Sequence, residues 1–363
     1  MRLFQNSGLY AAYVRRLAAL RDPLWSFERQ RTAFLDDRFG APHFLLPVLD
    51  GSAAAFFTNG DDEVLQRRWA QEHGLRTSIT LEEILLAQIE EHKTEVFYNI
   101  DPMRYQSAFL QRLPGCVRKS IAWRAAPSPN ADFSAYDLVV CNFPSILDSY
   151  RRAGWRGAYF SPAHDPVMDE YATSEERPID ILFVGGYSRH HRRRGQLLEA
   201  FANLQARYNI VFHLDSSRLT RAAETALGRL LPLAKYRRPL SLQKISREAI
   251  FGLDLYAAIS KAKIVLNGAI DMAGEDRGNM RCFEAMGCGA LLLTDDGHYP
   301  EGMLGGTTML TYRNSDDAIK SIDIALNELK TSRDLARNGH EMVRSRYSKV
   351  EQWRHFQELA AAA

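Results

Sequence analysis

The chain has 363 residues, 46 % of them hydrophobic and 25 % charged, with a formal net charge of +2. This length predicts two domains rather than one, and the composition is that of a globular protein. The nearly neutral balance argues against a nucleic-acid partner, and four cysteines without a CxxC pair, Cys116, Cys141, Cys282 and Cys288, indicate neither a zinc site nor a disulfide framework.

Residues 1–20 show no signal-peptide pattern, because arginines interrupt their apolar stretch. No part of the chain approaches the roughly 18 apolar residues that a bilayer-spanning helix needs. We therefore expect a cytoplasmic protein, and contact with the inner face of a membrane stays open as an alternative.

Short apolar runs then alternate with amphipathic stretches, which is typical of βαβ units with a parallel sheet. Helices are predicted at 61–73 and 81–92, and the first half is expected to form one α/β domain over residues 1–165. The strands predicted in this half lie at 2–5, 44–49, 53–58, 95–98, 120–123, 138–141 and 158–160.

A linker is predicted at 161–178, where three prolines and several acids break every period. A second α/β domain is expected over residues 166–345, so that it includes the end of this linker. Its predicted strands lie at 180–184, 210–214, 264–267 and 290–294, and a helix is predicted at 195–208.

The first predicted strand of the second domain ends in two glycines and an arginine-rich turn. Glycines let a ligand approach the backbone closely, and arginines can bind phosphates through two hydrogen bonds each. A solvated basic turn is the alternative, but cations at a helix N-terminus oppose the helix dipole unless an anion lies there. The ligand-binding candidates of this turn are Gly185, Gly186, Tyr187, Arg189, Arg193 and Arg194.

The segment 267–274 follows another predicted strand of this domain. Ligands bind at the carboxyl ends of parallel strands in open α/β sheets, so Asn267 and Asp271 are candidates for ligand contact. Both are also ordinary turn residues.

The stretch 274–295 is the most informative part of the sequence. It predicts a helix over 279–286, with Asn279 at its start, followed by a glycine-broken turn and a buried strand. Arg277, Arg281 and Glu284 fall near one face of that helix, whose N-terminus suits an anion such as a diphosphate. The alternative is a surface ion pair between Arg281 and Glu284.

Phe283-Glu-Ala-Met-Gly-Cys-Gly-Ala-Leu-Leu-Leu-Thr-Asp295 resembles the donor-site motif of the group 1 glycosyltransferases. The branch that includes spore-maturation CgeB-like proteins is more similar still, and 66–74 resembles a segment of their N-terminal domains. The resemblance implies a GT-B fold, with two Rossmann-like domains facing each other across a cleft and a C-terminal helix, 346–363, returning to the N-terminal domain.

The same resemblance implies roles for individual residues. The family's two acids match Asp276, expected at the donor sugar, and Glu284, expected at the ribose, although Asp replaces the usual Glu at the first position. The basic pair at the diphosphate matches Arg189 and either Arg193 or Arg194. Arg281 is expected to stabilise the leaving diphosphate, which makes the nucleotide sugar a substrate and leaves no need for a cofactor or metal.

The acceptor is expected to be a glycan, a lipid-linked glycan or a protein, held by the first domain. Candidates for a general base are His43, Asp101 and the pair His164-Asp165, each of which is also an ordinary structural residue. An epimerase on the same fold and a non-catalytic nucleotide-sugar-binding protein remain as alternatives. Four acid pairs, at 36–37, 61–62, 295–296 and 316–317, leave a metal-dependent route open.

Overall fold

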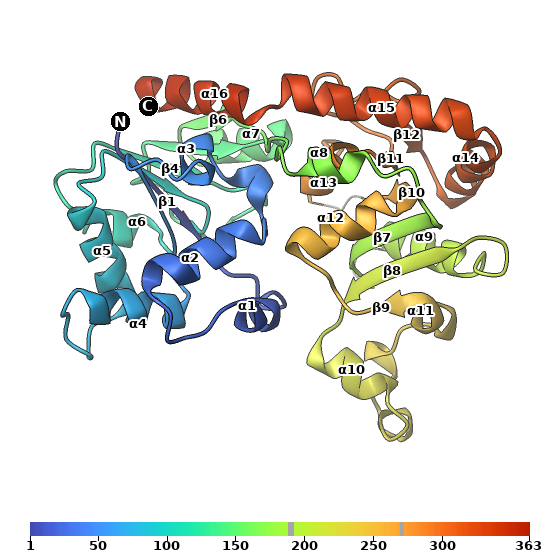
Figure 1. The fold of residues 1–363 in the computed structure, drawn as a ribbon, viewed down its shortest axis with the longest axis horizontal. Coiled ribbons are helices and arrows are strands. Elements are labelled where there is room, and N and C mark those ends of the chain that lie inside the picture. The colour runs from blue at the N-terminus through green and yellow to red at the C-terminus, as the bar shows by residue number, and fades with distance from the viewer. Residues whose placement is uncertain (188–191, 269–271) are drawn as a thin grey trace. The chain divides into compact units, whose positions relative to one another are not determined.

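The computed structural model describes residues 1–187, 192–268 and 272–363. The chain forms two compact units (Figure 1). Unit 1 comprises Met1–Ala163, Met272–Asp276 and Tyr347–Ala363, and unit 2 comprises His164–Asp271 and Arg277–Arg346. None of the helices that the structure describes combines the length and the hydropathy needed to cross a bilayer.

Unit 1 contains a six-stranded parallel sheet in the order β2-β1-β3-β4-β5-β6. Chain order reverses between β1 and β3, which makes that junction the switch point of the sheet. The strands are β1 (Leu3–Ser7), β2 (Ala55–Asn59), β3 (Val96–Asn99), β4 (Lys119–Trp123), β5 (Leu138–Cys141) and β6 (Gly157–Tyr159). The helices are α1 (Val14–Leu20), α2 (Phe27–Asp36), α3 (Leu46–Leu49), α4 (Glu63–Glu72), α5 (Leu81–Glu91), α6 (Ser107–Leu110), α7 (Pro144–Arg152) and α16 (Lys349–Ala362).

One predicted strand of this half is wrong. Instead of a strand, the segment 44–49 contains the helix α3 at Leu46–Leu49, preceded by Phe44, the C-cap of a short 3-10 helix at Ala41–His43. Pro47 explains the difference, because proline cannot donate a hydrogen bond to a sheet but is accepted in the first turn of a helix. The other six strands expected in this half are present, with ends shifted by one or two residues.

Unit 2 contains a second six-stranded parallel sheet, in the order β12-β11-β10-β7-β8-β9. Its switch point lies between β7 and β10, and the order corresponds to the Rossmann pattern. The strands are β7 (Ile179–Gly186), β8 (Ile210–Asp215), β9 (Ser246–Arg247), β10 (Ala262–Leu266), β11 (Leu291–Asp295) and β12 (Leu310–Tyr312). The helices are α8 (Met168–Ala172), α9 (Arg192–Ala202), α10 (Arg218–Glu224), α11 (Leu240–Ile245), α12 (Gly252–Ser260), α13 (Met280–Gly287), α14 (Ser315–Asn327) and α15 (Leu329–Arg346).

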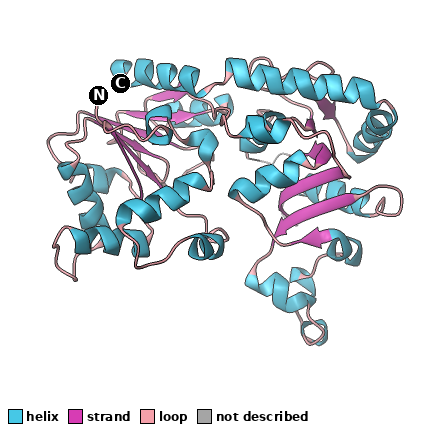
Figure 2. Cartoon of the chain, viewed as in Figure 1, coloured by secondary structure: helices cyan, strands magenta, loops and turns pink. Residues whose placement is uncertain are grey.

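The central strands of unit 2 are continuous apolar runs rather than alternating ones. In β7, Ile181, Leu182 and Phe183 are all almost completely buried, and the same holds for Leu291 to Leu293 in β11. Such runs are expected where helices cover both faces of a parallel sheet. Figure 2 distinguishes these strands from the helices of the same unit.

The last helix, α16, is part of unit 1. Its first residue, Lys349, is buried, and Nζ donates hydrogen bonds to the carbonyl oxygens of Ala41 (2.7 Å), Pro42 (3.1 Å) and Phe44 (2.7 Å). One turn later, the side-chain oxygen of Gln352 lies 3.0 Å from the same ammonium, so its three N–H groups are shared among four acceptors. The helix therefore holds the 41–44 segment against the core of unit 1.

Candidate functional site

The switch point of unit 2 brings together two of the segments that the sequence singled out. The strands β7 and β10 are hydrogen-bonded neighbours, so their carboxyl ends, Gly186 and Leu266, lie at the same edge of the sheet. Tyr187 and Asn267 follow directly. Ligands bind at this position in open α/β sheets, because the connections leave it in opposite directions and open a crevice.

The two glycines lie inside β7 rather than in the predicted turn, because Gly185 and Gly186 pair in register with Leu214 and Asp215 of β8. No atom of the described residues lies within 4 Å of the place that a Cβ on Gly186 would take, so these residues leave the backbone open to close approach there. Tyr187, the next residue, is held against α9 because its hydroxyl donates to Glu199 at 2.6 Å. Arg189 lies outside the described residues, as does Asp271.

Two arginines in the first turn of α9 differ in their surroundings. Arg194 donates from Nε (3.1 Å) and Nη2 (2.6 Å) to the carbonyl oxygen of Gly268, in the loop that follows β10. It therefore spans the switch point. The neighbouring Arg193 is exposed, and its side chain makes no hydrogen bond or ion pair within the part of the chain that the structure describes.

A network of side chains ties the end of β10 to the start of α13 and the end of β11. The amides of Asn267 and Asn279 exchange hydrogen bonds of 3.4 and 3.3 Å. Asn267 also donates to the Thr294 hydroxyl at 3.1 Å, and that hydroxyl lies 2.8 Å from the Tyr299 hydroxyl. The hydroxyl of Tyr312 donates to the Asn267 carbonyl at 2.7 Å. These contacts fix where α13 begins.

The loop before α13 is held on the end of β11. Arg277 forms an ion pair with Asp295, and its backbone N–H donates to the carbonyl oxygen of His298 at 2.8 Å. The next residue, Gly278, has φ of 103°, and a Cβ there would lie 2.6 Å from the Pro300 ring. Only glycine fits both the conformation and the close approach.

The ion pair of Arg281 and Glu284 exists, but it is not the surface pair that the sequence left open. The Arg281 guanidinium donates to a Glu284 oxygen at 2.6 Å, and the two side chains are 16 % and 3 % exposed. Burial raises the pKa of Glu284 above its usual value, and the neighbouring Arg281 only partly offsets this. A buried pair of this kind adds little net stability, so its presence calls for another reason.

Two helices begin at this edge of the sheet. In a βαβ unit each helix runs opposite to its strands, so the N-termini of α9 and α13 both lie near the carboxyl ends of β7 and β10. Helix N-termini carry partial positive charge and unpaired N–H groups. Together with Arg194 and Arg281, they make this edge of unit 2 suitable for an anion.

Asp276 is in unit 1. Its Oδ2 accepts a hydrogen bond of 2.6 Å from the backbone N–H of Ser145, at the first turn of α7. The Ser145 hydroxyl donates in turn to the Ala273 carbonyl at 2.9 Å. Asp276 thus caps a helix of unit 1, whereas Glu284 is in unit 2.

His164 is buried at the opposite end of α13 from Arg281. Its Nε2 lies 2.9 Å from an Asp169 oxygen, its ring packs against Gly287, and burial lowers its pKa. Asp169 is also 3.3 Å from His340. An eight-residue helix is about 12 Å long, so the structure does not group His164 with the anion-binding edge.

The switch point of unit 1 has a different chemistry, which the sequence reasoning largely missed. Asn6 donates to Asn99 at 2.9 Å, and Asp61 accepts the backbone N–H of Leu9 at 2.9 Å. Arg104 lies 3.4 Å from Asp61 and 3.2 Å from Asp101, and burial raises the pKa of Asp61. The signal was present, since Asn99 ends β3 and Asp61 closely follows β2, the two strands that flank β1.

His43 is a weak base in this structure. Burial and the nearby Lys349 lower its pKa to about 3, so its imidazole is neutral at physiological pH but takes up a proton poorly. Its ring lies 4.6 Å from that of Trp123. These surroundings favour a packing role for His43.

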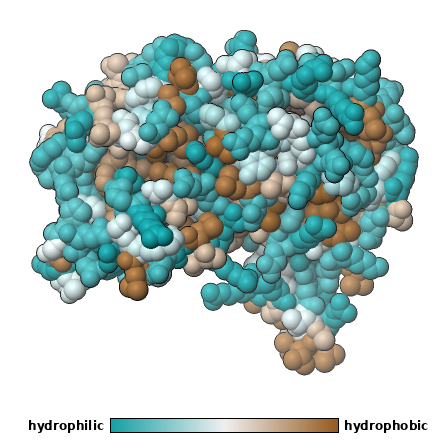
Figure 3. Space-filling view, in the orientation of Figure 1, coloured by the Kyte–Doolittle hydropathy of each residue, from teal (hydrophilic) through white to brown (hydrophobic). Residues whose placement is uncertain are grey.

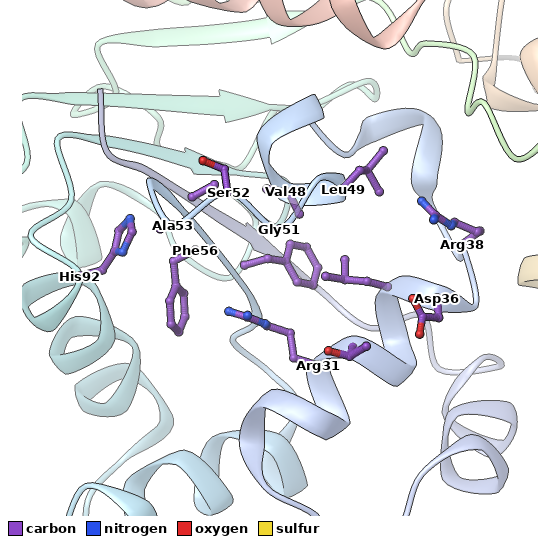
Figure 4. A pocket seen from close by; sticks show the side chains of 14 residues that line it. Arg31, Asp36, Arg38, Val48, Leu49, Gly51, Ser52, Ala53, Phe56 and His92 are labelled. Atoms are coloured by element: carbon purple, nitrogen blue, oxygen red, sulfur yellow. The ribbon is translucent and has the colours of Figure 1, made fainter.

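Two pockets lie at the amino ends of the strands. One, with a volume of about 360 Å³, is in unit 1 beside Ala55 at the start of β2, and is lined by Arg31, Asp36, Phe56 and His92 among others (Figure 4). The other, of about 780 Å³, is in unit 2 beside Lys263 at the start of β10. Each pocket therefore lies at the opposite edge of its sheet from the carboxyl ends of the strands, where the switch-point crevice is. Among the described residues, no three His, Cys, Asp or Glu side chains are grouped as a metal site.

Comparison with known families finds one match. Residues 191–358, less than half of the chain, match the family described as glycosyl transferase-like. This segment includes Arg193, Arg194 and the whole motif from Asp276 to Asp295. No curated protein sequence matches the chain.

Several solved structures match over almost the whole length. Anabaena Alr3699/HepE, in complex with UDP and glucose, shares 14 % identity, covers 100 % of both chains and gives a TM-score of 0.59. A glycosyltransferase from Rickettsia africae shares 10 % identity over 99 % of this chain and 97 % of that one, with a TM-score of 0.57. Sucrose-phosphate synthase from Thermosynechococcus elongatus shares 13 % identity over 99 % of both, with a TM-score of 0.52. The two parallel six-stranded sheets therefore form a GT-B fold of the α/β class.

Proposed function

We propose that this protein is a glycosyltransferase that moves a sugar from a nucleotide-diphosphate sugar, most simply a UDP-sugar, to a hydroxyl acceptor. The observation that carries the proposal is the switch point of unit 2, where Arg194 and the N-termini of α9 and α13 meet the open backbone of Gly186. The glycosyl transferase-like match over 191–358 and the UDP bound by the Anabaena protein support it.

The reaction breaks the bond between the anomeric carbon and the diphosphate and forms a bond from that carbon to the acceptor oxygen. Negative charge builds up on the leaving diphosphate. Arg194, Arg281 and the two helix N-termini would stabilise that charge without reorganising, which is the usual source of the largest catalytic effect. Because these groups would supply positive charge at the diphosphate, they support a route without a metal. The acceptor oxygen would attack the face of the sugar from which the diphosphate leaves and would pass its proton to the leaving phosphate, so that the anomeric configuration is retained.

Glu284 would accept hydrogen bonds from the ribose, and this explains why a carboxylate is kept in a buried pair. Asp276 would contact the sugar. A carboxylate offers about four acceptor positions, so capping α7 does not by itself prevent a second role. Asn267 and Asn279 would act indirectly, by fixing the start of α13.

The acceptor would be bound by unit 1. Asp61 and Asp101, at the switch point of that unit, can accept hydrogen bonds from sugar hydroxyls. A glycan, a lipid-linked glycan or a protein-linked sugar all present such hydroxyls. Placement in the CgeB-like branch and a cytoplasmic location belong to the same proposal.

A thermal-shift screen tests the donor. UDP, GDP, dTDP and CMP, each with and without a sugar, are compared, because a ligand at 100 times its Kd stabilises by about 2.7 kcal/mol. We expect UDP and UDP-sugars to raise Tm. Arg194→Ala should remove the shift, whereas Arg193→Ala, one residue away, should largely keep it.

Turnover separates a transferase from its alternatives. Release of UDP and sugar from one UDP-sugar, accelerated by an acceptor, supports the transferase. Conversion to the epimeric UDP-sugar would identify an epimerase, and binding without turnover would identify a binding protein. The absence of a shift with every nucleotide would contradict all three.

A further inference from the structure

A basic lobe, residues 216–247, follows β8 of unit 2 and ends with β9. It contains α10, α11 and two short 3-10 helices, and in Figure 1 it extends from the strand edge beneath β9. Its only acid is Glu224, against eight cations: Arg218, Arg221, Arg229, Lys235, Arg237, Arg238, Lys244 and Arg247. Since the whole chain carries a net charge of only +2, the rest of the chain is net negative.

The end of the lobe is apolar and exposed. Leu227 is 76 % exposed, Leu230 is 84 % exposed and Leu231 is 55 % exposed. Figure 3 shows hydrophobic atoms gathered at this tip. Single exposed leucines are common on protein surfaces, but three within five residues form a patch that water solvates poorly.

Hydrogen bonds and close backbone packing hold the lobe in a defined conformation. Arg238 donates to both oxygens of Glu224 at 2.7 Å, and Arg237 donates to the carbonyl oxygens of Ala223 and Gly228 at 3.1 Å. A Cβ on Gly228 would lie 1.9 Å from the Ala222 carbonyl oxygen, so the backbone segments pack directly on each other. These contacts hold the leucines out at the tip.

The other arginines of the lobe do not make such hydrogen bonds within it. The side chains of Arg218, Arg221, Arg229 and Arg247 are exposed and make no ion pair or hydrogen bond with any described residue. The lobe therefore combines unbalanced positive charge with an exposed aliphatic tip. That combination is typical of segments that lie in the interface of an anionic membrane.

We propose that the basic lobe binds the protein to an anionic lipid bilayer, with the leucine tip entering the boundary between headgroups and acyl chains. A nucleic acid would satisfy the cations but not the leucines, because bases stack on aromatic or guanidinium planes rather than on aliphatic side chains. The proposal does not depend on the proposed catalytic function.

Vesicle sedimentation of the full chain tests the proposal. We expect binding to vesicles of phosphatidylcholine mixed with phosphatidylglycerol, weak binding to phosphatidylcholine alone, and loss of binding as salt rises. The variant L227S/L230S/L231S should lower partition about tenfold or more. The variant R218Q/R221Q/R229Q should lower it about fivefold for each cation removed.

Matched variants elsewhere give the controls. Leu24 of unit 1 is 79 % exposed, and Lys330 and Arg333 are exposed cations of α15, so L24S and K330Q/R333Q should bind vesicles as the unaltered chain does. Circular dichroism and Tm check that each variant folds. If a lobe variant does not fold, the dependence of vesicle binding by the unaltered chain on salt and lipid composition still tests the proposal.

Three results would overturn the proposal. One is no binding to the mixed vesicles at low salt. Another is binding of a duplex RNA that depends on the lobe arginines while vesicles stay unbound. The third is a change in oligomeric state of the leucine variant, measured by light scattering, without a change in vesicle binding, which would assign the tip to a contact between copies.

Discussion

The two switch points of this molecule have the same backbone geometry and opposite chemistry. Each lies where chain order reverses in a six-stranded parallel sheet, between β1 and β3 in unit 1 and between β7 and β10 in unit 2. In unit 2 the edge carries glycines, Arg194 and two helix N-termini. In unit 1 it carries paired amides and the carboxylates Asp61 and Asp101.

This difference shows what the fold decides and what the side chains decide. The topology provides a crevice in both units, but the charge of the side chains selects the ligand. A cationic edge suits a diphosphate, and an edge of amides and carboxylates suits neutral hydroxyl groups. If the proposed function holds, substitutions that act on one edge alone separate donor binding, proposed for the unit 2 edge, from acceptor use, proposed for the unit 1 edge.

The largest expected effect concerns the support of the unit 1 edge. Lys349→Met removes the donor that three buried carbonyl oxygens share. Because those of Ala41 and Pro42 keep backbone donors, we expect it to lower the free energy of unfolding by about 3 kcal/mol. The chain's five tryptophans, Trp25, Trp69, Trp123, Trp155 and Trp353, all lie in unit 1. Urea unfolding followed by tryptophan fluorescence therefore reports on this unit.

Lys93→Met is the control for that substitution. Lys93 is 63 % exposed and paired with Glu90 on the surface, so the unfolding midpoint should not move. The pKa of His43 should also rise in the Lys349 variant, because Lys349 contributes to lowering it. An unchanged midpoint in Lys349→Met would show that α16 does not support this edge.

A second substitution acts on the donor edge. Glu284→Gln should lower UDP affinity and turnover about 100-fold, because the amide offers fewer acceptor positions and no charge. Isothermal titration with UDP measures this. Asp334→Asn, in an exposed ion pair with Arg337 on α15 of the same unit, should leave affinity unchanged.

The same substitution, Glu284→Gln, should not lower the stability of the fold, although it lowers UDP affinity. The pKa of Glu284 is raised, so the folded state keeps a proton that the unfolded state releases, and stability falls as the pH rises past the ordinary glutamate value. Glu284→Gln cannot ionise and should be as stable at neutral pH, or more stable. Lost stability with unchanged UDP affinity would assign Glu284 a structural role only.

Most of the strands follow from patterns that are local in sequence. Short apolar runs separated by helical periods predicted ten of the twelve strands that the structure describes, whereas β9, of two residues, and β12 were not predicted. The prediction of a strand at 44–49 failed because Pro47 favours a helix start. Glycines and arginines near a strand end drew attention to the unit 2 edge, and its role in ligand binding stays a prediction.

Side-chain partners could not be predicted, since they depend on contacts distant in sequence. Asp276 caps α7, more than 120 residues earlier in the chain, with its partner at Ser145. His164 and Asp165 looked like a base at a hinge, but burial and Asp169 place His164 in a packed cluster. Spacing within a motif does not show which side chain a carboxylate will meet.

A third substitution acts on the acceptor edge and should have a smaller effect. A Cβ on Gly8 would lie 2.8 Å from an Asp101 oxygen, so Gly8→Ala should displace that carboxylate. We expect the KM for the acceptor to rise about tenfold, the loss of roughly one hydrogen bond to a charged group, with UDP affinity unchanged. Gly115→Ala, where no atom lies within 4 Å, is the control. Weaker UDP binding in Gly8→Ala would show that the two edges are not independent.

The smallest expected effect is that of metal removal. A metal-dependent transferase would need acids at the donor edge that are available to a cation. Asp295, the acid that ends β11 there, is paired with Arg277, and elsewhere Asp62 is paired with Arg21 and Asp317 accepts from Arg313. Because guanidinium groups can take the place of a divalent ion at the diphosphate, we expect excess EDTA to change turnover by less than about twofold, far less than Arg281→Ala. Turnover that is lost on chelation and restored by magnesium or manganese would overturn the arginine-based mechanism and, with it, the contrast between a cationic donor edge and a carboxylate acceptor edge.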